Sequence, residues 1–503
     1  MRAPALSIFT VTLAVAALGC AKGPAVQPLA PSPRAGITSQ ESRGPADIER
    51  VATNELLPVV VAKGARPYLL AERMQHFAIP GVSIAVVREG KVAWAGAFGV
   101  KDASTKQAVT PTTLFQAGSI SKPVATIATL RMVDDGQLFL DEDVNGRLVS
   151  WKVPRADGAP AEGITLRRLL SHTAGLGVHG FGGYQAGAAF PSLVQLLDGK
   201  PPANSAPVRV ERTPGERMVY SGGGFEVVEL LATEVGKRPF ADLARAKLFE
   251  PLGLARSTYA QPLPFALQAD AASGHEDGAP ISGKWKVYPE LTAAGLWTTP
   301  TELARIFLDL SAGLEGKSKV LSAKTTREML TAQKQGYGLG VGVEGEGPSA
   351  RFSHGGVNEG FEAYFVMFPA LGEGAVVMTN GGGGVRLAKE IIRGLARDRG
   401  WPGWAPVERA VASLSSDALA AIAGGYEITI DPKTKQSFEL TREGAGLTLR
   451  AKGDRPQHWL PASDTTFFTS DSETTFKVVK SGGAVTELLI HQTGATYHAL
   501  KTR

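Results

Sequence analysis

Strand-like segments stand at both ends of one long stretch of the sequence, and helical segments fill the space between them. Two apolar runs, 82–87 and 92–98, are joined by Arg88-Glu89-Gly90-Lys91, which predicts an antiparallel hairpin with glycine at the turn. The later strands are expected at 336–343, 363–368 and 375–379. This order predicts an α/β (α+β) body in which the two ends of the stretch share one antiparallel sheet and a mostly helical lobe is inserted between them.

Helical periodicity marks the inserted lobe. A further helical pattern, interrupted by Pro58 and Pro67, precedes the hairpin over residues 46–75. The helices of the lobe are expected at 123–135, 166–171, 226–235 and 300–310.

The composition changes near Trp401-Pro402-Gly403-Trp404, and short alternating strands with tight turns follow. Apolar and polar residues alternate on both sides of Glu443-Gly444, and residues 475–479 are expected to pair with 485–490. Regularly spaced hairpins of this kind predict a small antiparallel barrel or sandwich, with the domain boundary between residues 403 and 404.

The first 45 residues have the pattern of an export signal and a tether. Arg2 precedes an apolar run that is too short to span a bilayer, which indicates a signal peptide over residues 1–20. The run ends at Ala17-Leu18-Gly19-Cys20, which resembles a bacterial lipobox with Cys20 as the lipidated residue; an ordinary signal peptide with a chance cysteine is the alternative. Residues 21–45 are rich in Pro, Ala, Gly and Ser and are expected to form a flexible tether. The protein is thus expected at the periplasmic face of a bacterial membrane, held only by a lipid anchor.

Composition argues against several other classes of protein. The net charge of +5 comes from 53 basic and 48 acidic residues without a basic block, so no nucleic-acid partner is expected. Cys20 is the only cysteine, so the chain has no internal disulfide. The eight histidines form no His-Glu-x-x-His pair, so no metal and no other cofactor is expected. The chain also lacks the Gly-x-Ser-x-Gly elbow of α/β-hydrolases.

One short segment carries the first sign of chemistry. Ser119-x-x-Lys122 is the only Ser-x-x-Lys sequence in the chain, and helical spacing puts both side chains on one face. Pro123 is tolerated only in the first turn of a helix, so the helix is expected to begin near Ser119. The positive end of the helix dipole disfavours a protonated Lys122 and stabilises a developing anion, which suits a serine nucleophile. Taken alone, the motif also fits an ordinary surface pair.

Three further segments follow in order along the chain. They are Leu169–Leu176, which contains Ser171-His172-Thr173; Arg217–Phe225, which contains Tyr220-Ser221-Gly222; and Phe352–Phe361, which contains His354-Gly355-Gly356. Together with Ser119-x-x-Lys122 they resemble the serine β-lactamase and penicillin-binding-protein superfamily, in the branch of class C β-lactamases, D-stereospecific aminopeptidases, DD-carboxypeptidases and related esterases. The resemblance covers about residues 71–400, and the C-terminal strands resemble the lipocalin-like barrel appended to some of these hydrolases.

The resemblance implies a β-lactamase/transpeptidase-like body over residues 46–403 and a lipocalin-like barrel over 404–503. It makes Ser119 the nucleophile, Lys122 its proton acceptor or electrostatic partner, and Tyr220 a second base, and it leaves open which base takes the first proton. A phenol beside a cation is expected to ionise more readily than a free tyrosine. His172 is expected to support its loop. The backbone amides of Ser119 and Val357 are expected to form the oxyanion hole, and the substrate-binding residues implied are Gly222, His354, Gly355 and Gly356.

The motifs depart from the usual family pattern in two places that bear on the substrate. Gly222 stands where the family commonly has asparagine, and Gly355 replaces the usual threonine or serine. His354 stands where relatives carry lysine or histidine, and it is a weaker cation than lysine at neutral pH. Substrates that end in a carboxylate would lose contacts. The expected function is therefore a serine hydrolase that forms an acyl-enzyme with small-molecule or peptide substrates, esters or amides, including D-amino acid or peptidoglycan-derived ones. The alternatives are a β-lactamase or DD-carboxypeptidase and, in another class, a catalytically weak penicillin-binding or sensor protein.

Overall fold

The structure is a computed structural model that describes residues 44–154, 163–431, 434–452, 455–492 and 494–502. The expected signal peptide, Cys20 and nearly all of the expected tether lie outside these residues. The described chain divides into two units, which are described separately: a body of residues 44–53 and Leu69–Ile392, and a C-terminal unit of Asn54–Tyr68 and the described residues from Arg393 onward. This grouping places residues 393–403 and Asn54–Tyr68 with the C-terminal strands, whereas the sequence pattern placed them with the hydrolase domain.

A seven-stranded antiparallel sheet forms the centre of the body. Its strand order is β11-β12-β13-β14-β2-β3-β4, so the early hairpin pairs through β14 with strands from the end of the body, as expected. The strands are β2 (Gly81–Arg88), β3 (Lys91–Asp102), β4 (Gln107–Ala108), β11 (Gly342–Glu344), β12 (Arg351–Asn358), β13 (Phe361–Phe368) and β14 (Glu373–Thr379).

Two turns in this sheet follow from local backbone chemistry. Glu89 and Gly90 both have positive φ, the conformation of a two-residue hairpin turn between β2 and β3. The strand expected over 336–343 is wrong for most of its length, because only β11 is extended. Gly336 and Gly340 adopt left-handed backbone angles, at φ 74° and 71°, which interrupt an extended chain.

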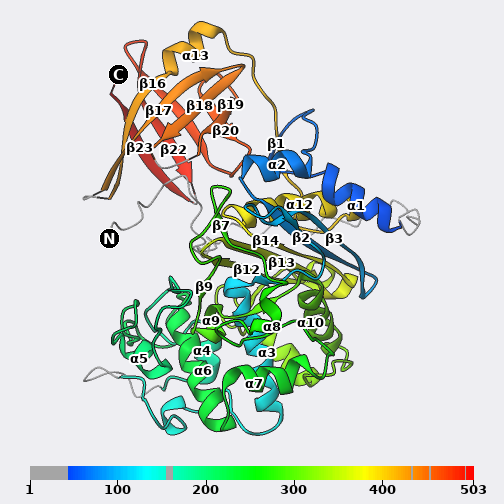
Figure 1. The fold of residues 1–503 in the computed structure, drawn as a ribbon. Coiled ribbons are helices and arrows are strands. Elements are labelled where there is room, and N and C mark those ends of the chain that lie inside the picture. Colours follow the sequence, from blue (N-terminus) through cyan, green and yellow to red (C-terminus); the bar gives the residue numbers. More distant parts are fainter. Residues whose placement is uncertain (1–43, 155–162, 432–433, 453–454, 493, 503) are drawn as a thin grey trace, which may run out of the picture. The chain divides into compact units, whose positions relative to one another are not determined.

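Helices lie on both faces of the sheet. Figure 1 shows α10 (Pro300–Gly313) and α12 (Gly384–Arg399) on opposite sides of it, and every residue of β2 is buried. The helices expected at 123–135, 166–171, 226–235 and 300–310 are all present, and the early helical pattern forms two separate helices. The remaining helices are α1 (Pro45–Asn54), α2 (Leu70–His76), α3 (Ser121–Asp134), α4 (Leu166–Leu170), α5 (Leu193–Asp198), α6 (Gly222–Gly236), α7 (Phe240–Ala244), α8 (Phe265–Gln268), α9 (Leu291–Ala294) and α11 (Ala323–Met329).

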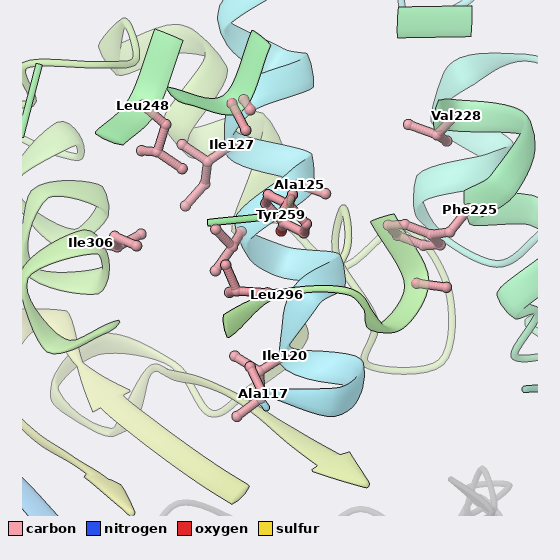
Figure 2. Packing of buried hydrophobic residues seen from close by; sticks show 14 of the residues in the cluster. Ala117, Ile120, Ala125, Ile127, Phe225, Val228, Leu248, Tyr259, Leu296 and Ile306 are labelled. Atoms are coloured by element: carbon pink, nitrogen blue, oxygen red, sulfur yellow. The ribbon is translucent and has the colours of Figure 1, made fainter. Parts of the chain in front are cut away.

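Helix α3 runs through the core of the helical lobe. Nearly all of its side chains are buried, and the Tyr259 hydroxyl group donates a 2.6 Å hydrogen bond to the Ser121 carbonyl group. Because the helix is enclosed on all sides, its N-terminal end is held firmly in place. Figure 2 shows the apolar side chains along and around it, among them Ile120, Ala125, Ile127, Tyr259, Leu296 and Ile306.

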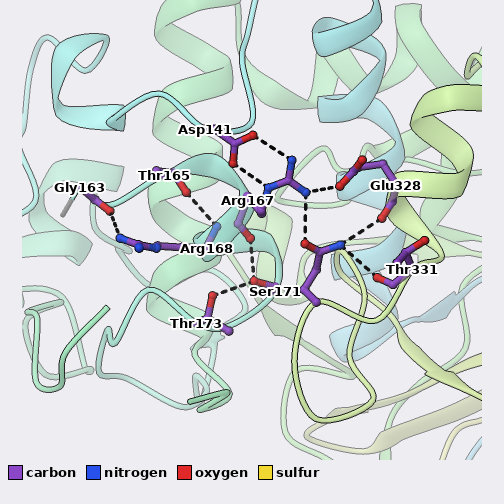
Figure 3. Close-up of polar contacts among 10 residues, drawn as sticks. Asp141, Gly163, Thr165, Arg167, Arg168, Ser171, Thr173, Glu328 and Thr331 are labelled. Carbon is purple, nitrogen blue, oxygen red and sulfur yellow. Dashed lines mark hydrogen bonds and ion pairs between the residues drawn. The ribbon is translucent and has the colours of Figure 1, made fainter. Parts of the chain in front are cut away.

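A polar network holds the short helix α4 that precedes His172. Arg167 pairs with Asp141 through two hydrogen bonds of 2.7 and 2.9 Å and also with Glu328. The Ser171 hydroxyl group donates to the Arg167 carbonyl group at 2.8 Å and contacts the Thr173 hydroxyl group (Figure 3). These bonds fix the backbone on both sides of His172.

Three short two-stranded sheets complete the body. They pair β5 (Phe115–Gln116) with β10 (Trp297–Thr298), β6 (Tyr184–Gln185) with β9 (Lys286–Val287), and β7 (His275–Glu276) with β8 (Ala279–Pro280).

The C-terminal unit contains a closed antiparallel barrel of the strands β16 to β23, which confirms the expected barrel. Its interior is filled by side chains: Trp459 and Phe467 both pack against the Phe476 ring, at 4.9 and 4.8 Å between ring centroids. Outside the barrel, β1 (Val60–Ala62) pairs in parallel with β15 (Val407–Arg409), which is why residues 54–68 group with this unit. The other elements are α13 (Ser416–Ile422), β16 (Gly424–Asp431), β17 (Thr434–Glu443), β18 (Gly446–Ala451), β19 (Gln457–Pro461), β20 (Thr466–Thr469), β21 (Thr475–Ser481), β22 (Ala484–Gln492) and β23 (Ala495–Lys501).

Within the described part of the chain, no helix combines the length and apolar character needed to cross a bilayer.

Candidate active site

Ser119 and Lys122 meet at the start of α3. Ser119 lies in a 3-10 turn, Gly118–Ile120, and α3 itself begins two residues later than the sequence predicted, at Ser121. The Lys122 amine donates to the Ser119 hydroxyl oxygen at 3.1 Å and to the Ala293 carbonyl oxygen at 2.9 Å. The serine hydroxyl group is thus within reach of a base.

The environment of Lys122 favours its neutral form. Its side chain is 2% exposed, and burial lowers the pKa of its amine from 10.5 to about 7, although the nearby Glu226 acts in the opposite direction. Near neutral pH a substantial fraction of Lys122 is therefore able to accept a proton, as a general base requires.

Tyr220 lies just before α6 and completes the group. The Lys122 amine lies 4.9 Å from the centre of its ring. Burial raises the pKa of the Tyr220 phenol well above its usual range, although a hydrogen bond with the Ser119 side chain acts against this rise. The expected easier ionisation of Tyr220 is therefore wrong, because desolvation of the phenolate outweighs the hydrogen bond with Ser119. At neutral pH Tyr220 holds its proton.

The imidazole ring of His172 packs against the phenol ring of Tyr220. Their ring centroids are 4.3 Å apart, and the Ser221 backbone amide donates to His172 Nδ1 at 3.1 Å. The Val219 amide donates to the His172 carbonyl group at 2.8 Å, so the residues on both sides of Tyr220 are bonded to His172. Burial and the charge of Lys122 hold the pKa of His172 well below its usual value, and the ring is neutral.

The serine turn and strand β12 approach each other backbone to backbone. A Cβ atom on Gly118 would lie 2.4 Å from the Val357 amide nitrogen, and one on Gly356 would lie 1.9 Å from the Ala117 carbonyl oxygen. Side chains at either position would force the two segments apart. The backbones of Ser119 and Val357 therefore lie side by side, the arrangement that the predicted oxyanion hole requires.

His354 faces the same site from β12. Its Nδ1 donates to the Gly355 carbonyl oxygen at 2.6 Å, so its Nε2 accepts the 3.0 Å hydrogen bond from the Tyr337 hydroxyl group. Burial, together with the charge of Lys122, lowers the pKa of His354 to about 4. His354 is therefore uncharged near neutral pH.

The space beside Gly222 is already filled. The Gly222 amide donates to the His179 carbonyl oxygen at 3.1 Å, and a Cβ atom on Gly222 would lie 2.9 Å from the Phe181 ring. An aromatic ring thus occupies the place of the family's asparagine side chain. Glycine at this position permits the loop that carries His179 and Phe181 to pack on the start of α6.

Three buried glutamates form a cluster, and the sequence did not point to any of them. Glu226 and Glu229 come from α6, and Glu290 immediately precedes α9; none of the three is more than 5% exposed. Glu229 accepts hydrogen bonds from the Leu291 and Thr292 amides at 2.9 and 3.3 Å, which fixes α9. Helix α9 in turn supplies the Ala293 carbonyl oxygen to Lys122.

The described residues contain no group of three or more His, Cys, Asp or Glu side chains arranged to hold a metal ion.

Comparison with known proteins agrees with this geometry. Penicillin-binding protein 4 of Amycolatopsis lactamdurans is 27% identical over 71% of this chain and 95% of its own. Protein flp of Staphylococcus aureus strain N315 is 22% identical over 62% of each chain, so the match spans less than two thirds of that relative.

Solved structures share the fold at low sequence identity. The octameric penicillin-binding protein homologue from Pyrococcus abyssi superposes with a TM-score of 0.58 and 20% identity, over 86% of this chain and 98% of that one. The D-alanine carboxypeptidase AmpC from Burkholderia cenocepacia superposes with a TM-score of 0.53 and 21% sequence identity, over 69% of this chain and 98% of that one. The model of the β-lactamase family matches residues 69–397, which include every residue of the site. The chain therefore belongs to the β-lactamase family and has the fold of the serine β-lactamases and penicillin-binding proteins.

Proposed function

We propose that the protein is a serine hydrolase that forms an acyl-enzyme on Ser119 from ester or amide substrates. The observation that carries this proposal is the 3.1 Å contact between the Lys122 amine and the Ser119 hydroxyl oxygen. A serine hydroxyl group is a poor nucleophile until a neighbouring base removes its proton, and a lysine whose pKa is about 7 is such a base at neutral pH.

The chemistry then runs in two halves. Ser119 Oγ attacks the substrate carbonyl carbon while its proton passes to Lys122, and the oxyanion lies against the amides of Ser119 and Val357. Tyr220 donates its phenolic proton to the leaving alcohol or amine and regains a proton from Lys122. Water then hydrolyses the acyl-enzyme by the same groups in reverse roles.

The surroundings of the nucleophile support uncharged substrates over those that end in a carboxylate. His354 is neutral, and Phe181 covers the position from which an asparagine would bind a substrate amide. Simple esters and uncharged amides require neither contact. D-amino acid amides and peptidoglycan-derived peptides without a free carboxylate remain within this class.

A D-alanine carboxypeptidase or β-lactamase is the second candidate. It is favoured by the activities for which two solved neighbours are described, a D-alanine carboxypeptidase and a β-lactamase/D-alanine carboxypeptidase. The neutral His354 speaks against it as the main activity, because a cation at this place is what would attract a carboxylate.

A binding or sensor protein without turnover is the rival from another class. Burying a lysine amine beside a serine carries a free-energy penalty. A cleft that only binds a ligand has no need of such a buried lysine. The retention of Ser119, Lys122 and Tyr220 in contact therefore favours catalysis.

A substrate panel tests these alternatives. Purified protein and its Ser119→Ala variant would be assayed against p-nitrophenyl esters, D-amino acid amides, peptides ending in D-Ala-D-Ala, and a chromogenic cephalosporin. We expect hydrolysis of the esters or amides that the variant loses. Turnover confined to the cephalosporin or the D-Ala-D-Ala peptides would favour the second candidate, and no turnover of any substrate would favour the sensor.

We further propose that the protein is exported and anchored through a lipid on Cys20, which precedes the described residues. The pattern of residues 1–20 supports this. In cells fed an alkyne fatty acid, we expect labelling of the wild type and none of Cys20→Ala. Equal labelling of both would contradict the anchor.

A further inference from the structure

A short bridging segment, Ala293–Leu296, runs from the end of α9 to β10 and is bonded to two parts of the active site. Its first carbonyl oxygen accepts the 2.9 Å hydrogen bond from the Lys122 amine. Its last residue donates from its backbone amide to the Ser121 hydroxyl oxygen at 3.0 Å and accepts from the Ala117 amide at 2.9 Å. This last residue packs beside the turn that carries Ser119 (Figure 2). The bridging segment therefore holds the proposed base and the proposed nucleophile together.

The side chain of Asn358 bonds strand β12 to the same bridging segment. Asn358 is 5% exposed and directly follows Val357, whose backbone amide is the second proposed oxyanion donor. Its Nδ2 donates to the Ala294 carbonyl oxygen of the bridging segment at 3.1 Å and to Gln116 Oε1 at 2.8 Å. Because a carbonyl oxygen only accepts hydrogen bonds, the side-chain nitrogen must face Ala294, and both of its hydrogens are used. One side chain thus connects the oxyanion end of β12 to the segment that holds the base.

Gln116 holds the Asn358 amide from a second side. It is 2% exposed, and its backbone pairs with Trp297, the residue that follows the bridging segment. Its side-chain nitrogen donates to the Lys286 carbonyl oxygen at 2.7 Å, so its side-chain oxygen is turned toward Asn358. Both acceptors of the Asn358 amide are therefore fixed by the backbone around the serine turn.

The end of β12 that carries Val357 needs such a connection. Strand β13 pairs with β12 over residues 352–358, whereas β11 pairs with residues 351–353. Val357 thus lies beyond the pairing with β11, and the contacts at Gly356 and Asn358 supplement the pairing with β13. Loss of the Asn358 bonds is expected to leave the pairing with β13 in place and to let this end of the strand move relative to the serine turn.

We propose that Asn358 is a positioning residue for the reaction at Ser119: through the Ala294 carbonyl group, its side-chain amide keeps the Val357 oxyanion donor in register with Lys122 and the serine turn. This proposal rests on the proposed function of Ser119 and Lys122 and deepens it, because it names a residue that fixes the geometry of that chemistry.

The position of an oxyanion donor matters more in the transition state than in the bound substrate. The negative charge on the substrate oxygen is complete only in the tetrahedral state, so a displaced amide weakens that state selectively. A misplacement of about 1 Å costs about 100-fold in rate. Loss of the Asn358 amide should therefore appear in kcat and in the affinity for tetrahedral adducts, whereas KM should change little.

The test is Asn358→Leu, which keeps a side chain of similar size and removes both hydrogen-bond donors. The measurements are kcat and KM for a p-nitrophenyl ester, the inhibition constant of a boronic acid that forms a tetrahedral adduct on the serine, and the melting temperature. We expect kcat to fall about 10- to 100-fold and the inhibition constant to rise by a similar factor, while KM stays within about threefold of the wild type. A purely structural role would lower the melting temperature and the fraction of active enzyme without changing the inhibition constant of the enzyme that remains active.

Asn380→Leu is the matched control. Asn380 is also buried and also donates from Nδ2 to two carbonyl oxygens, those of Val100 and Lys101, each at 3.1 Å. It follows β14 and bonds the end of β3, so its loss should lower the melting temperature and leave kcat and the inhibition constant unchanged. Asn358→Ala, which also removes the amide, provides a second variant should Asn358→Leu fail to fold, and the same changes in kcat and inhibition constant are expected.

The outcomes separate the two proposals. A folded Asn358 variant with the kcat and inhibition constant of the wild type, or an equal change of both in Asn380→Leu, would overturn the role of Asn358 while leaving Ser119 and Lys122 in place. Ester hydrolysis that survives Ser119→Ala would instead overturn the proposed function itself.

Discussion

The carbonyl oxygen of Ala117 lies so close to Gly356 that a Cβ atom at that glycine would be only 1.9 Å from it. This contact joins the serine turn to strand β12 with no side chain between them. The distance between the Ser119 and Val357 amides thus depends on the absence of a single methyl group.

Gly356→Ala should therefore reduce activity by more than it reduces stability. Moving β12 away from the turn displaces one oxyanion donor, and loss of such a donor costs about 100- to 1000-fold in rate. The measurement is kcat/KM for an ester, together with the melting temperature. Gly146→Ala is the control, because a Cβ atom there meets nothing within 4 Å; an active Gly356→Ala variant would contradict the close-approach argument.

Wild-type activity should rise with pH through a value near 7. Lys122 accepts the Ser119 proton only when it is neutral, and burial lowers the pKa of its amine to about 7. The rate should therefore be low where Lys122 is an ammonium group and reach its plateau above that pH. A profile of kcat/KM between about pH 5 and pH 9 checks this, and a plateau that extends unchanged to the acid end would show that Lys122 is not the titrating base.

Gly222→Asn should be tolerated only when Phe181 is shortened. In the single variant the new Cβ atom would lie 2.9 Å from the Phe181 ring, so we expect a lower melting temperature and lower activity. Gly222→Asn combined with Phe181→Ala should recover stability and favour acylamino substrates over simple esters by about tenfold, the worth of one hydrogen bond. Phe181→Ala alone is the control. Additive effects on melting temperature in the double variant would argue that the two residues do not meet.

Glu290 should make the folded state less stable as the pH rises. Burial raises the pKa of the Glu290 carboxyl group from 4.5 to about 8. The protonated carboxyl group therefore contributes its full stabilisation of the folded state below the pKa of the unfolded chain, and this contribution is lost as the pH rises through about 8. Glu290→Gln should therefore lose less melting temperature than the wild type between about pH 5 and pH 9. The exposed Glu276→Gln should follow the wild type, and parallel curves for all three proteins would contradict the buried titration.

Much of this molecule could be predicted from its sequence. The β2–β3 hairpin, the helices of the lobe and the C-terminal barrel each have a local signal, because apolar periodicity and glycine turns act over a few residues. Ser119, Lys122 and Tyr220 were predicted as a group from their order along the chain, and the structure places them together.

The glutamate cluster could not be predicted in the same way. Glutamate on a helix normally faces solvent, and nothing local distinguishes Glu226 and Glu229 from such residues. Glu229 is bonded to the amides at the start of α9, which comes from a distant part of the chain. The sequence also led us to predict a lowered pKa for Tyr220, whereas the structure has it raised. The degree of burial that causes this rise is a property of the assembled fold.

The packing of Phe181 beside Gly222 could not be predicted from the sequence either. The sequence showed that a side chain was missing at this position, but only the packed loop shows that Phe181 fills the space. From the sequence, glycine at position 222 indicated only the loss of a contact to substrate. In the structure, the same glycine is what allows the Phe181 ring to pack there.

The identity of the nucleophile is the claim on which the rest depends, and intact-mass analysis after exposure to a fluorophosphonate tests it most directly. We expect one added phosphonyl group in the wild type, mapped to Ser119, and none in Ser119→Ala. Ser121→Ala should still be labelled, because the Ser121 hydroxyl group is buried and bonded to the Gly118 carbonyl oxygen. A label that persists in Ser119→Ala, or that maps to another residue, would show that Ser119 is not the nucleophile.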